Sequence, residues 1–276
     1  KIEESSQVHF RDLVIHQAPE FMVLPSGNRG PVRFENVDMV VPVGTKERLV
    51  SWRDVFHVKN NRYGPIWEDC EFDGWAMQDD LFNLTANWGF VDTINSDHPM
   101  IIVNFTGNEG DPWGTGDWLT AEQLNGNTKG SARVAYSVAS GGKYYIELDR
   151  EIPGLAVGDR LYDEETSNRG AVIRRCRTYA GDAGTATWRQ RTPVLIEDNY
   201  FQDFYLWING EWDAEGPVPE DITIRRNTFK GSGRFIDTGY DSGQRATRNI
   251  MFLDNLFDHP SVGLHLAYDV LFACNN

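Results

Sequence analysis

The sequence is short of cysteine, of basic residues and of long apolar runs. Its three cysteines, Cys70, Cys176 and Cys274, are an odd number without regular spacing, which excludes a disulfide framework and a zinc knuckle. Lys and Arg number 26 against 41 Asp and Glu, and the resulting net charge of −15 argues against a nucleic-acid partner. No apolar run is long enough to cross a membrane, so no membrane partner is expected.

Aromatic residues, by contrast, are plentiful. The chain has nine Trp and ten Tyr among 276 residues, and 40% of its residues are hydrophobic. Trp and Tyr rings fill protein cores, and their faces also bind sugar rings. The composition therefore allows a large core and is compatible with a carbohydrate ligand. The acidic charge fits a secreted or periplasmic protein. The chain begins Lys1-Ile2-Glu3-Glu4, which is not a signal peptide, so we expect either that a signal has been removed or that the chain is an excised piece.

A short pattern recurs along the chain: an apolar residue, two polar residues, a ladder residue, any residue, and an aromatic. Looser copies surround Leu13, Val37 and Cys176, and a last, incomplete copy is Phe272-Ala273-Cys274-Asn275. The clearest copies are Trp67-Glu68-Asp69-Cys70-Glu71-Phe72, Ile196-Glu197-Asp198-Asn199-Tyr200-Phe201, Ile224-Arg225-Arg226-Asn227-Thr228-Phe229 and Phe252-Leu253-Asp254-Asn255-Leu256-Phe257.

The spacing of these copies predicts the fold. Ladder residues are 24 apart from Leu13 to Val37, and 28 apart from Asn199 to Asn227 and from Asn227 to Asn255. A period near 25 in a β-rich sequence predicts a right-handed parallel β-helix, in which stacked Asn side chains bond successive coils. The Leu-x-x-Leu-x-Leu pattern of leucine-rich repeats is absent, and the period-two alternation argues against helical repeats.

Residues 92–166 contain no copy of the pattern. They hold glycine-rich turns and β-like runs, which predict a small β-barrel-like insertion on the binding face. The expected organisation is therefore β-helix coils over 1–91, the insertion over 92–166, and further coils over 167–276. Because the chain stops as a new copy begins, we expect the last part to be truncated.

Two adjacent carboxylates, Asp79 and Asp80, stand in the otherwise apolar run Trp75–Leu84. If that run is a strand, its neighbouring side chains face opposite sides, and at least one Asp needs a site that tolerates it. Paired carboxylates carry out glycoside hydrolysis. A turn or a structural salt bridge is the alternative. Asp54, in the preceding coil, is expected about 5 Å away if its strand stacks on this one, unless Arg53 or His57 neutralises it.

A count of ten residues past each ladder position predicts one polar row on the outer face. It reaches Val23, Asp80, Asn209, Asp237 and His265. Four of these five could bind sugar or move protons, although outward rows of a β-helix are polar in any case. We take Asp237 as a candidate substrate-binding residue and His265 as a structural one.

At this point the chain resembles glycoside hydrolase family 110, the β-helix exo-acting α-galactosidases. The resemblance runs from Val8 to about Gly239 and depends on the order and spacing of several motifs. These are Asp54, the Asp-Asp-x-x-Asn of Asp79–Asn83, the insertion, Arg169-Gly170-Ala171-Val172-Ile173, the coil Val194–Phe201, and Trp212-Asp213-Ala214-Glu215-Gly216.

The resemblance implies an inverting hydrolase of terminal α-linked galactose. No cofactor is expected, and no residues stand at a convincing spacing for a metal site, while a structural calcium stays open. Carried over, Asp79 is the general acid, while Asp54 and Asp80 position and activate water. Trp212 would stack on the sugar and Glu215 would bind its hydroxyls. Thr85 stands where the family has His, which leaves the identity of the sugar open.

The arginine-rich coils allow two interpretations. Arg189, with Arg174, Arg175, Arg177 and Arg191, could bind sulfate or carboxylate groups of a polysaccharide, or these residues could form a solvated face balanced by acids. Two rival functions also stay open. One is a polysaccharide lyase with a base such as Arg189, and the other is a non-catalytic glycan-binding β-helix, as in adhesins and tailspikes. A homo-oligomer is compatible with each.

Overall fold

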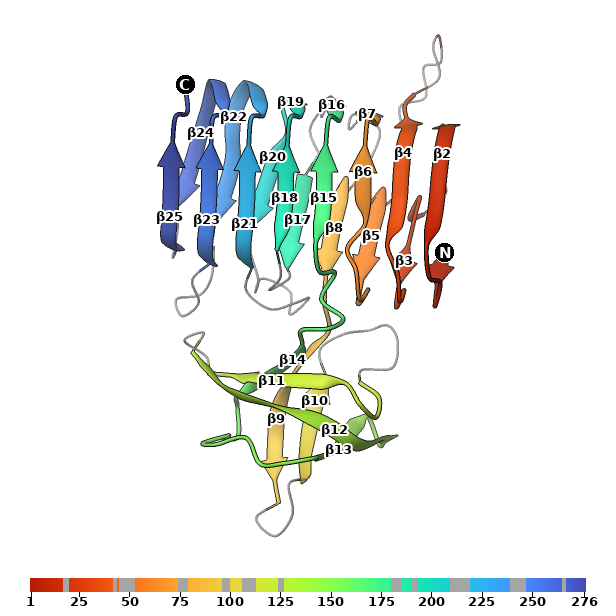
Figure 1. Ribbon diagram of the computed structural model, residues 1–276, viewed down its shortest axis with the longest axis vertical. Coiled ribbons are helices and arrows are strands. Elements are labelled where there is room, and N and C mark those ends of the chain that lie inside the picture. Colours follow the sequence, from red (N-terminus) through yellow and green to blue (C-terminus); the bar gives the residue numbers. More distant parts are fainter. Residues whose placement is uncertain are drawn as a thin grey trace.

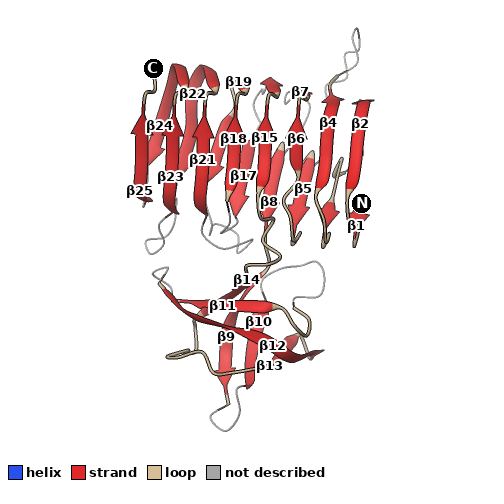
Figure 2. Cartoon of the chain, in the orientation of Figure 1, coloured by secondary structure: helices blue, strands red, loops and turns tan. Residues whose placement is uncertain are grey.

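The computed structural model describes most of the chain. The described residues are 1–16, 20–41, 44, 53–73, 79–95, 100–105, 113–123, 127–179, 185–189, 193–208, 219–238, 247–264 and 267–276. Among them the protein is all-β, with one curled parallel sheet and one closed antiparallel barrel (Figures 1 and 2). In these ranges no helix is long and apolar enough to span a membrane.

The parallel sheet is built from three rows of strands, which the chain visits in turn. Each strand pairs in parallel with the strand of the same row one turn further along the chain, as Ile173 does with Trp67 and with Ile196. The first row contains the first part of β2 (Val8–Ile15) and of β4 (Val32–Met39), then β6 (Ile66–Glu68), β15 (Ala171–Arg174), β18 (Val194–Glu197), β21 (Glu220–Arg225), β23 (Thr247–Leu253) and β25 (Ala267–Ala273).

The second and third rows complete each coil. The second row contains the later part of β2 and of β4, then β7 (Glu71–Asp73), β16 (Arg177–Tyr179), β19 (Tyr200–Gln202) and the first part of β22 (Thr228–Thr238) and of β24 (Leu256–Leu264). The third row contains β1 (Ile2–Glu3), β3 (Pro25–Ser26), β5 (Phe56–Lys59), β8 (Phe82–Thr85), β17 (Thr185–Arg189), β20 (Tyr205–Ile208) and the last part of β22 and of β24.

The recurring sequence pattern corresponds to the corner between the first and second rows. Its apolar residue and its aromatic both point inward, and Trp67, Phe72, Ile196 and Phe201 are fully buried. Aromatic rings of successive coils stack, with Phe201 and Phe229 5.1 Å apart and Phe229 and Phe257 5.2 Å apart. The interior of the sheet is therefore one continuous apolar stack, as the periodicity predicts.

The ladder is present where the sequence places it. The side-chain oxygens of Asn199, Asn227 and Asn255 each accept a hydrogen bond from the backbone N–H of the previous ladder residue, at 2.8–3.0 Å. Asn275 extends the series and accepts from the N–H of Asn255 at 2.9 Å. The residue ahead of each ladder position has left-handed backbone, with φ of 57° at Asp198. This conformation suits Asp and Asn, whose short polar side chains tolerate it.

A second Asn ladder, absent from the sequence prediction, follows the third row. The side-chain oxygen of Asn61 accepts from the backbone N–H of Asn28 at 3.0 Å, and that of Asn168 accepts from the N–H of Asn61 at 3.0 Å. The side-chain amide of Asn168 donates to the backbone oxygen of Thr85 at 2.7 Å. The separation of 107 positions between Asn61 and Asn168 hides this period in the sequence.

The barrel interrupts the coil between β8 and β15. Its strands are β9 (Trp88–Ile94), β10 (Met100–Phe105), β11 (Trp118–Glu122), β12 (Thr128–Ser140), β13 (Lys143–Leu148) and β14 (Arg160–Asp163), and antiparallel pairing closes the ring. It has its own apolar core, which includes Val103, Leu119 and Ile146. The first barrel strand begins at Trp88, ahead of residue 92, where the sequence pattern places the start of the insertion.

Candidate functional site

The three aspartates singled out by the sequence lie together at the start of the third row. Asp54 precedes β5, and Asp79 and Asp80 precede β8. These two strands are neighbours, with Phe56 paired to Phe82, and the N–H of Val55 donates to the backbone oxygen of Asp80 at 2.9 Å. Adjacent coils thus bring residues 26 positions apart side by side.

The expectation that Asp79 and Asp80 lie inside a strand is wrong. Strand β8 begins only at Phe82, so the alternation of strand side chains does not apply to the pair. The backbone N–H of Asp80 donates to Oδ1 of Asp54 at 3.2 Å, which fixes the segment against the previous coil. Asp79 is exposed, whereas Asp80 is only 9% exposed.

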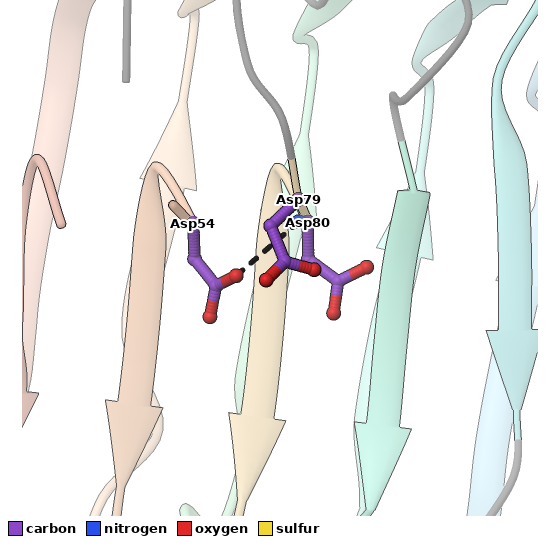
Figure 3. Close-up of side chains that lie close together, drawn as sticks. All are labelled: Asp54, Asp79 and Asp80. Atoms are coloured by element: carbon purple, nitrogen blue, oxygen red, sulfur yellow. Dashed lines mark hydrogen bonds between the residues drawn. The ribbon is translucent and has the colours of Figure 1, made fainter. Parts of the chain in front are cut away.

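The carboxylates of Asp54, Asp79 and Asp80, hereafter the acidic cluster, converge. One oxygen from each lies within 4.8 Å of one oxygen from each of the others. The three side chains reach the same space beside the first residues of β5 and β8 (Figure 3). The sequence predicted that Asp54 lies close to the Asp pair if their strands stack, and this prediction is confirmed.

Asp54 is deeply buried and has a histidine partner. Only 2% of the residue is exposed, and Nδ1 of His57 lies 2.6 Å from its Oδ2. The His57 ring also packs on Phe21, with ring centroids 4.7 Å apart. The guanidinium group of Arg53 lies over the same Phe21 ring, 5.4 Å from its centroid. Of the two neutralising residues that the sequence suggested, His57 is the one in contact with Asp54.

The pKa of the Asp79 carboxyl is raised above its usual value. Burial by the surrounding chain is the main cause, although part of the residue is exposed, and the negative charge of Asp54 adds to it. His57, the N–H of Asp80 and Arg53 act in the opposite direction. Asp79 therefore holds a proton at a higher pH than an isolated aspartate, which is what a general acid requires.

A buried amide lies beside this histidine. Asn83 in β8 pairs with His57 in β5, so their side chains share the outer face of the row. Asn83 is only 6% exposed, and its side-chain oxygen has no hydrogen-bond partner. Such burial argues against glycosylation at Asn83-Leu84-Thr85. It also leaves a polar acceptor ready for a ligand next to the cluster.

The other predicted site residues are not brought to the cluster by any described contact. Asp237 pairs with Trp207, which pairs with Thr187 and through it with Asn83, so the register places its backbone three strands from β8, about 14 Å away. Asp237 therefore stands in line with Asn83, three residues after Asp80, and the expectation that it stands in line with Asp80 is wrong.

Arg189 pairs with Thr85, at the far end of β8 from Asp80 and about 16 Å along the strand. The backbone of Arg189 is therefore also distant from the acidic cluster. Trp212, Glu215, Asn209 and His265 lie outside the described residues. The substrate-binding roles expected for Trp212 and Glu215 stay predictions.

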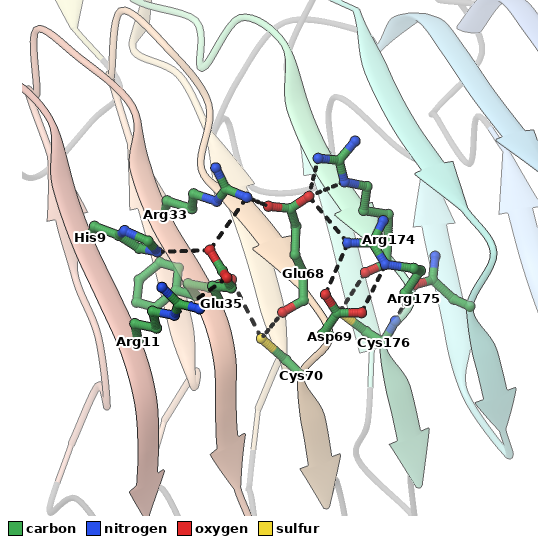
Figure 4. Close-up of polar contacts among 12 residues, drawn as sticks. His9, Arg11, Arg33, Glu35, Glu68, Asp69, Cys70, Arg174, Arg175 and Cys176 are labelled. Atoms are coloured by element: carbon green, nitrogen blue, oxygen red, sulfur yellow. Dashed lines mark hydrogen bonds and ion pairs between the residues drawn. The ribbon is translucent and has the colours of Figure 1, made fainter.

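The arginines of the coil corners have acidic partners. Arg174 and Arg33 both contact Glu68, and Nε of Arg175 lies 2.8 Å from Oδ1 of Asp69 (Figure 4). The same arrangement recurs two coils later, where Arg225 and Arg226 contact Glu197 and Asp198. For Arg174 and Arg175 this favours the balanced, solvated face over an anion-binding role.

The acidic cluster offers the chemistry of acids, and also that of cation ligands. Carboxylate oxygens at this spacing can bind a hard cation such as Ca²⁺, but acidic groups also gather without one. Sequence reasoning named His57 only as one of two possible neutralising partners of Asp54, and it missed Asn83 as a buried acceptor. The signals available were the Asp-x-x-His spacing ahead of β5 and the polar residue opposite it in β8.

Comparison with known proteins adds no relative. No protein-family model matches the chain, and a search of curated proteins finds no match. The resemblance to family 110 therefore depends on the motifs alone, and the geometry of the acidic cluster is the basis for any functional assignment.

Proposed function

We propose that this protein is a glycoside hydrolase that removes terminal α-linked galactose from oligo- or polysaccharides. The observation that carries the proposal is the convergence of Asp54, Asp79 and Asp80 within 4.8 Å, one of them with a raised pKa. The scaffold is proposed to be a right-handed parallel β-helix, and the protein to act outside the cytoplasm on carbohydrate. The order of the sequence motifs supports galactose as the sugar.

The division of roles follows from environment. Glycosidases need one carboxyl that stays protonated and one that is ionised, and unequal surroundings separate the two. Asp79 is the general acid, because burial and the charge of Asp54 favour its protonated form. Asp54 is held by His57 and by the N–H of Asp80, which fix the orientation of its carboxylate. Asp80 supplies the second carboxylate facing the sugar.

The spacing of the carboxylates bears on stereochemistry. Inverting pairs stand about 6.5–9.5 Å apart to admit a water, whereas retaining pairs stand about 5–5.5 Å apart. The 4.8 Å bound joins one selected oxygen of each carboxyl and does not give the separation of the carboxyl groups, so the inversion that the resemblance implies stays the proposal. Proton NMR of the sugar first released distinguishes the two, since retention gives the α anomer and inversion the β anomer.

The primary experiment is turnover on a panel of α-galactosides and galactans. Release of reducing galactose by the wild type, and its loss in Asp79→Asn, supports the proposal. Binding without product over a long incubation would instead indicate a glycan-binding protein. Products with the ultraviolet absorbance of a new double bond would indicate a lyase. Either outcome ends the hydrolase assignment.

A further inference from the structure

Two buried cysteines occupy facing positions in adjacent coils. Glu68 pairs with Arg174 on one side of them, and Glu71 pairs with Arg177 on the other. Both pairs are separated by the same number of residues, so Cys70 and Cys176, which lie between, stand opposite each other. The N–H of Asp69 donates to Arg174 O at 3.2 Å, and the N–H of Arg177 donates to Cys70 O at 2.9 Å, which fixes this register.

The spacing meets the requirement for a covalent link. Neighbouring parallel strands are about 4.8 Å apart, and disulfides join Cα atoms about 4.4–6.8 Å apart. Both cysteines follow a left-handed residue, with φ of 54° at Asp69 and 53° at Arg175, so both side chains turn the same way into the interior. They are 2% and 1% exposed, and both are free thiols here.

The two thiols stand at ladder positions of adjacent coils. In the coils that follow, the ladder residue is Asn, whose side-chain amide clamps one coil to the next, whereas Leu13 and Val37 hold this position in the first two coils. The thiol of Cys70 donates to the backbone oxygen of Glu68 at 3.1 Å, and that of Cys176 to the backbone oxygen of Arg174 at 3.3 Å, so both side chains have the same orientation, and each affects the pKa of the other. Cys176 lowers the pKa of the Cys70 thiol, while burial raises the pKa of Cys176 well above its usual value. Cys70 is thus the more readily ionised of the two.

We propose that Cys70 and Cys176 form a disulfide under oxidising conditions. The bond replaces the missing Asn clamp at the one coil junction that the barrel interrupts. It forms by exchange with a small disulfide such as oxidised glutathione. The Cys70 thiolate attacks that disulfide and releases one reduced thiol, and Cys176 then displaces the second. Two protein thiols are oxidised and one small disulfide is reduced, so the exchange balances.

The burial of both sulfurs decides how the bond is tested, because a small oxidant reaches them during folding more readily than afterwards. The variant Cys274→Ser removes the third, exposed thiol and serves as the background. The protein is unfolded, refolded in a mixture of reduced and oxidised glutathione, and compared with a sample refolded in reductant. Thiols are titrated in denaturant, and intact mass is measured before and after reduction.

The expected result is a monomer without titratable thiols, lighter by two hydrogen atoms than the reduced sample. Its Tm is expected to rise by about 5 °C, because the bond closes a loop of more than a hundred residues. Adding Cys70→Ser to the background is the control, and it should keep one thiol and show no dependence of Tm on oxidant.

Secretion of the same background variant into an oxidising compartment gives a second measurement that needs no refolding. Natively folded protein that retains both thiols in either preparation, or that carries only glutathione adducts, would overturn the proposal. The outcome is independent of the proposed hydrolase activity, because neither cysteine belongs to the acidic cluster.

Discussion

Two groups of acidic side chains stack between adjacent coils, and they differ in what the next coil supplies. Glu68 and Asp69 at the first corner face Arg174 and Arg175, and the arrangement recurs two coils later. At the start of the third row, Asp54 faces Asp79 and Asp80 instead. The fold stacks equivalent positions about 4.8 Å apart in both places, so the sequence of the next coil alone decides between an ion pair and a cluster of like charge.

The two outcomes have opposite electrostatic consequences. Hydrogen bonds from Arg175 lower the pKa of Asp69, and those from Arg226 lower the pKa of Asp198. Burial and a neighbouring carboxylate raise the pKa of Asp79. The corner acids therefore favour folding at neutral pH, whereas the cluster opposes it. A cluster of like charges that destabilises the folded state is typical of a functional site.

The largest effect is expected at the cluster. Asp79→Asn should lower kcat/KM on an α-galactoside about a thousandfold, because it removes the proton donor without changing the shape of the side chain. Asp69→Asn is the matched control, since it removes an equivalent carboxylate at the corner. It should leave kcat/KM unchanged. Equal losses in both variants would show that activity follows stability and not the cluster.

The next effect concerns stability at the corner. Glu68 is 1% exposed and contacts both Arg33 and Arg174. Glu68→Gln leaves two guanidinium groups without their shared carboxylate, and we expect unfolding in urea to show a loss of about 2 kcal/mol. Turnover at low denaturant should not change. An unaltered urea midpoint would mean that the corner ion pairs are replaced by solvent without cost.

A third test separates the causes of the raised pKa at Asp79. Asp54→Asn removes the like charge, so the pKa of Asp79 should fall, as measured by carbon-13 NMR of the labelled carboxyl. His57→Gln removes a group that lowers it, so the pKa should rise. A pKa that stays constant in both variants would leave burial as the sole cause.

The smallest effect is expected from the exposed member of the corner. Asp69 is about half exposed, and its ion pair with Arg175 is screened by solvent. Asp69→Asn should cost about 0.5 kcal/mol or less at pH 7. Because the folded pKa is lowered, this contribution is present above the unfolded pKa and is lost as the pH falls through the folded one. The wild type and the variant should therefore unfold alike in strong acid.

Sequence reasoning predicted the corner between the first two rows correctly, because the pattern around Asn199, Asn227 and Asn255 is short and contiguous. It failed for the third row, because the number of residues between the second and third rows varies. Strand β19 ends at Gln202 and β20 begins at Tyr205, whereas β7 ends at Asp73 and β8 begins at Phe82. A fixed count of ten residues therefore misaligned Asp237.

The acidic cluster was predictable in membership but not in its environment. Asp54, Asp79 and Asp80 stand out as carboxylates among apolar residues. The burial of Asn83 depends on packing between coils, since Asn83 pairs with His57 26 residues earlier, whereas the contact of His57 with Asp54 spans only three residues. No local pattern encodes the packing around Asn83, whereas the Asp-x-x-His spacing was enough to name His57 as a possible neutralising neighbour of Asp54.

The hydrogen bond between Asn168 and Thr85 means that the chain leaves the coil for the barrel and returns at nearly the same point. A short turn could then bridge residues 85 and 168, and the coils on either side would stack as before, since β17 already pairs with β8. The barrel is in this sense an insertion whose removal would leave the pairing of the coils unchanged. Such an attachment point would let a lineage exchange one accessory module for another while the acids beside β5 and β8 stay in place.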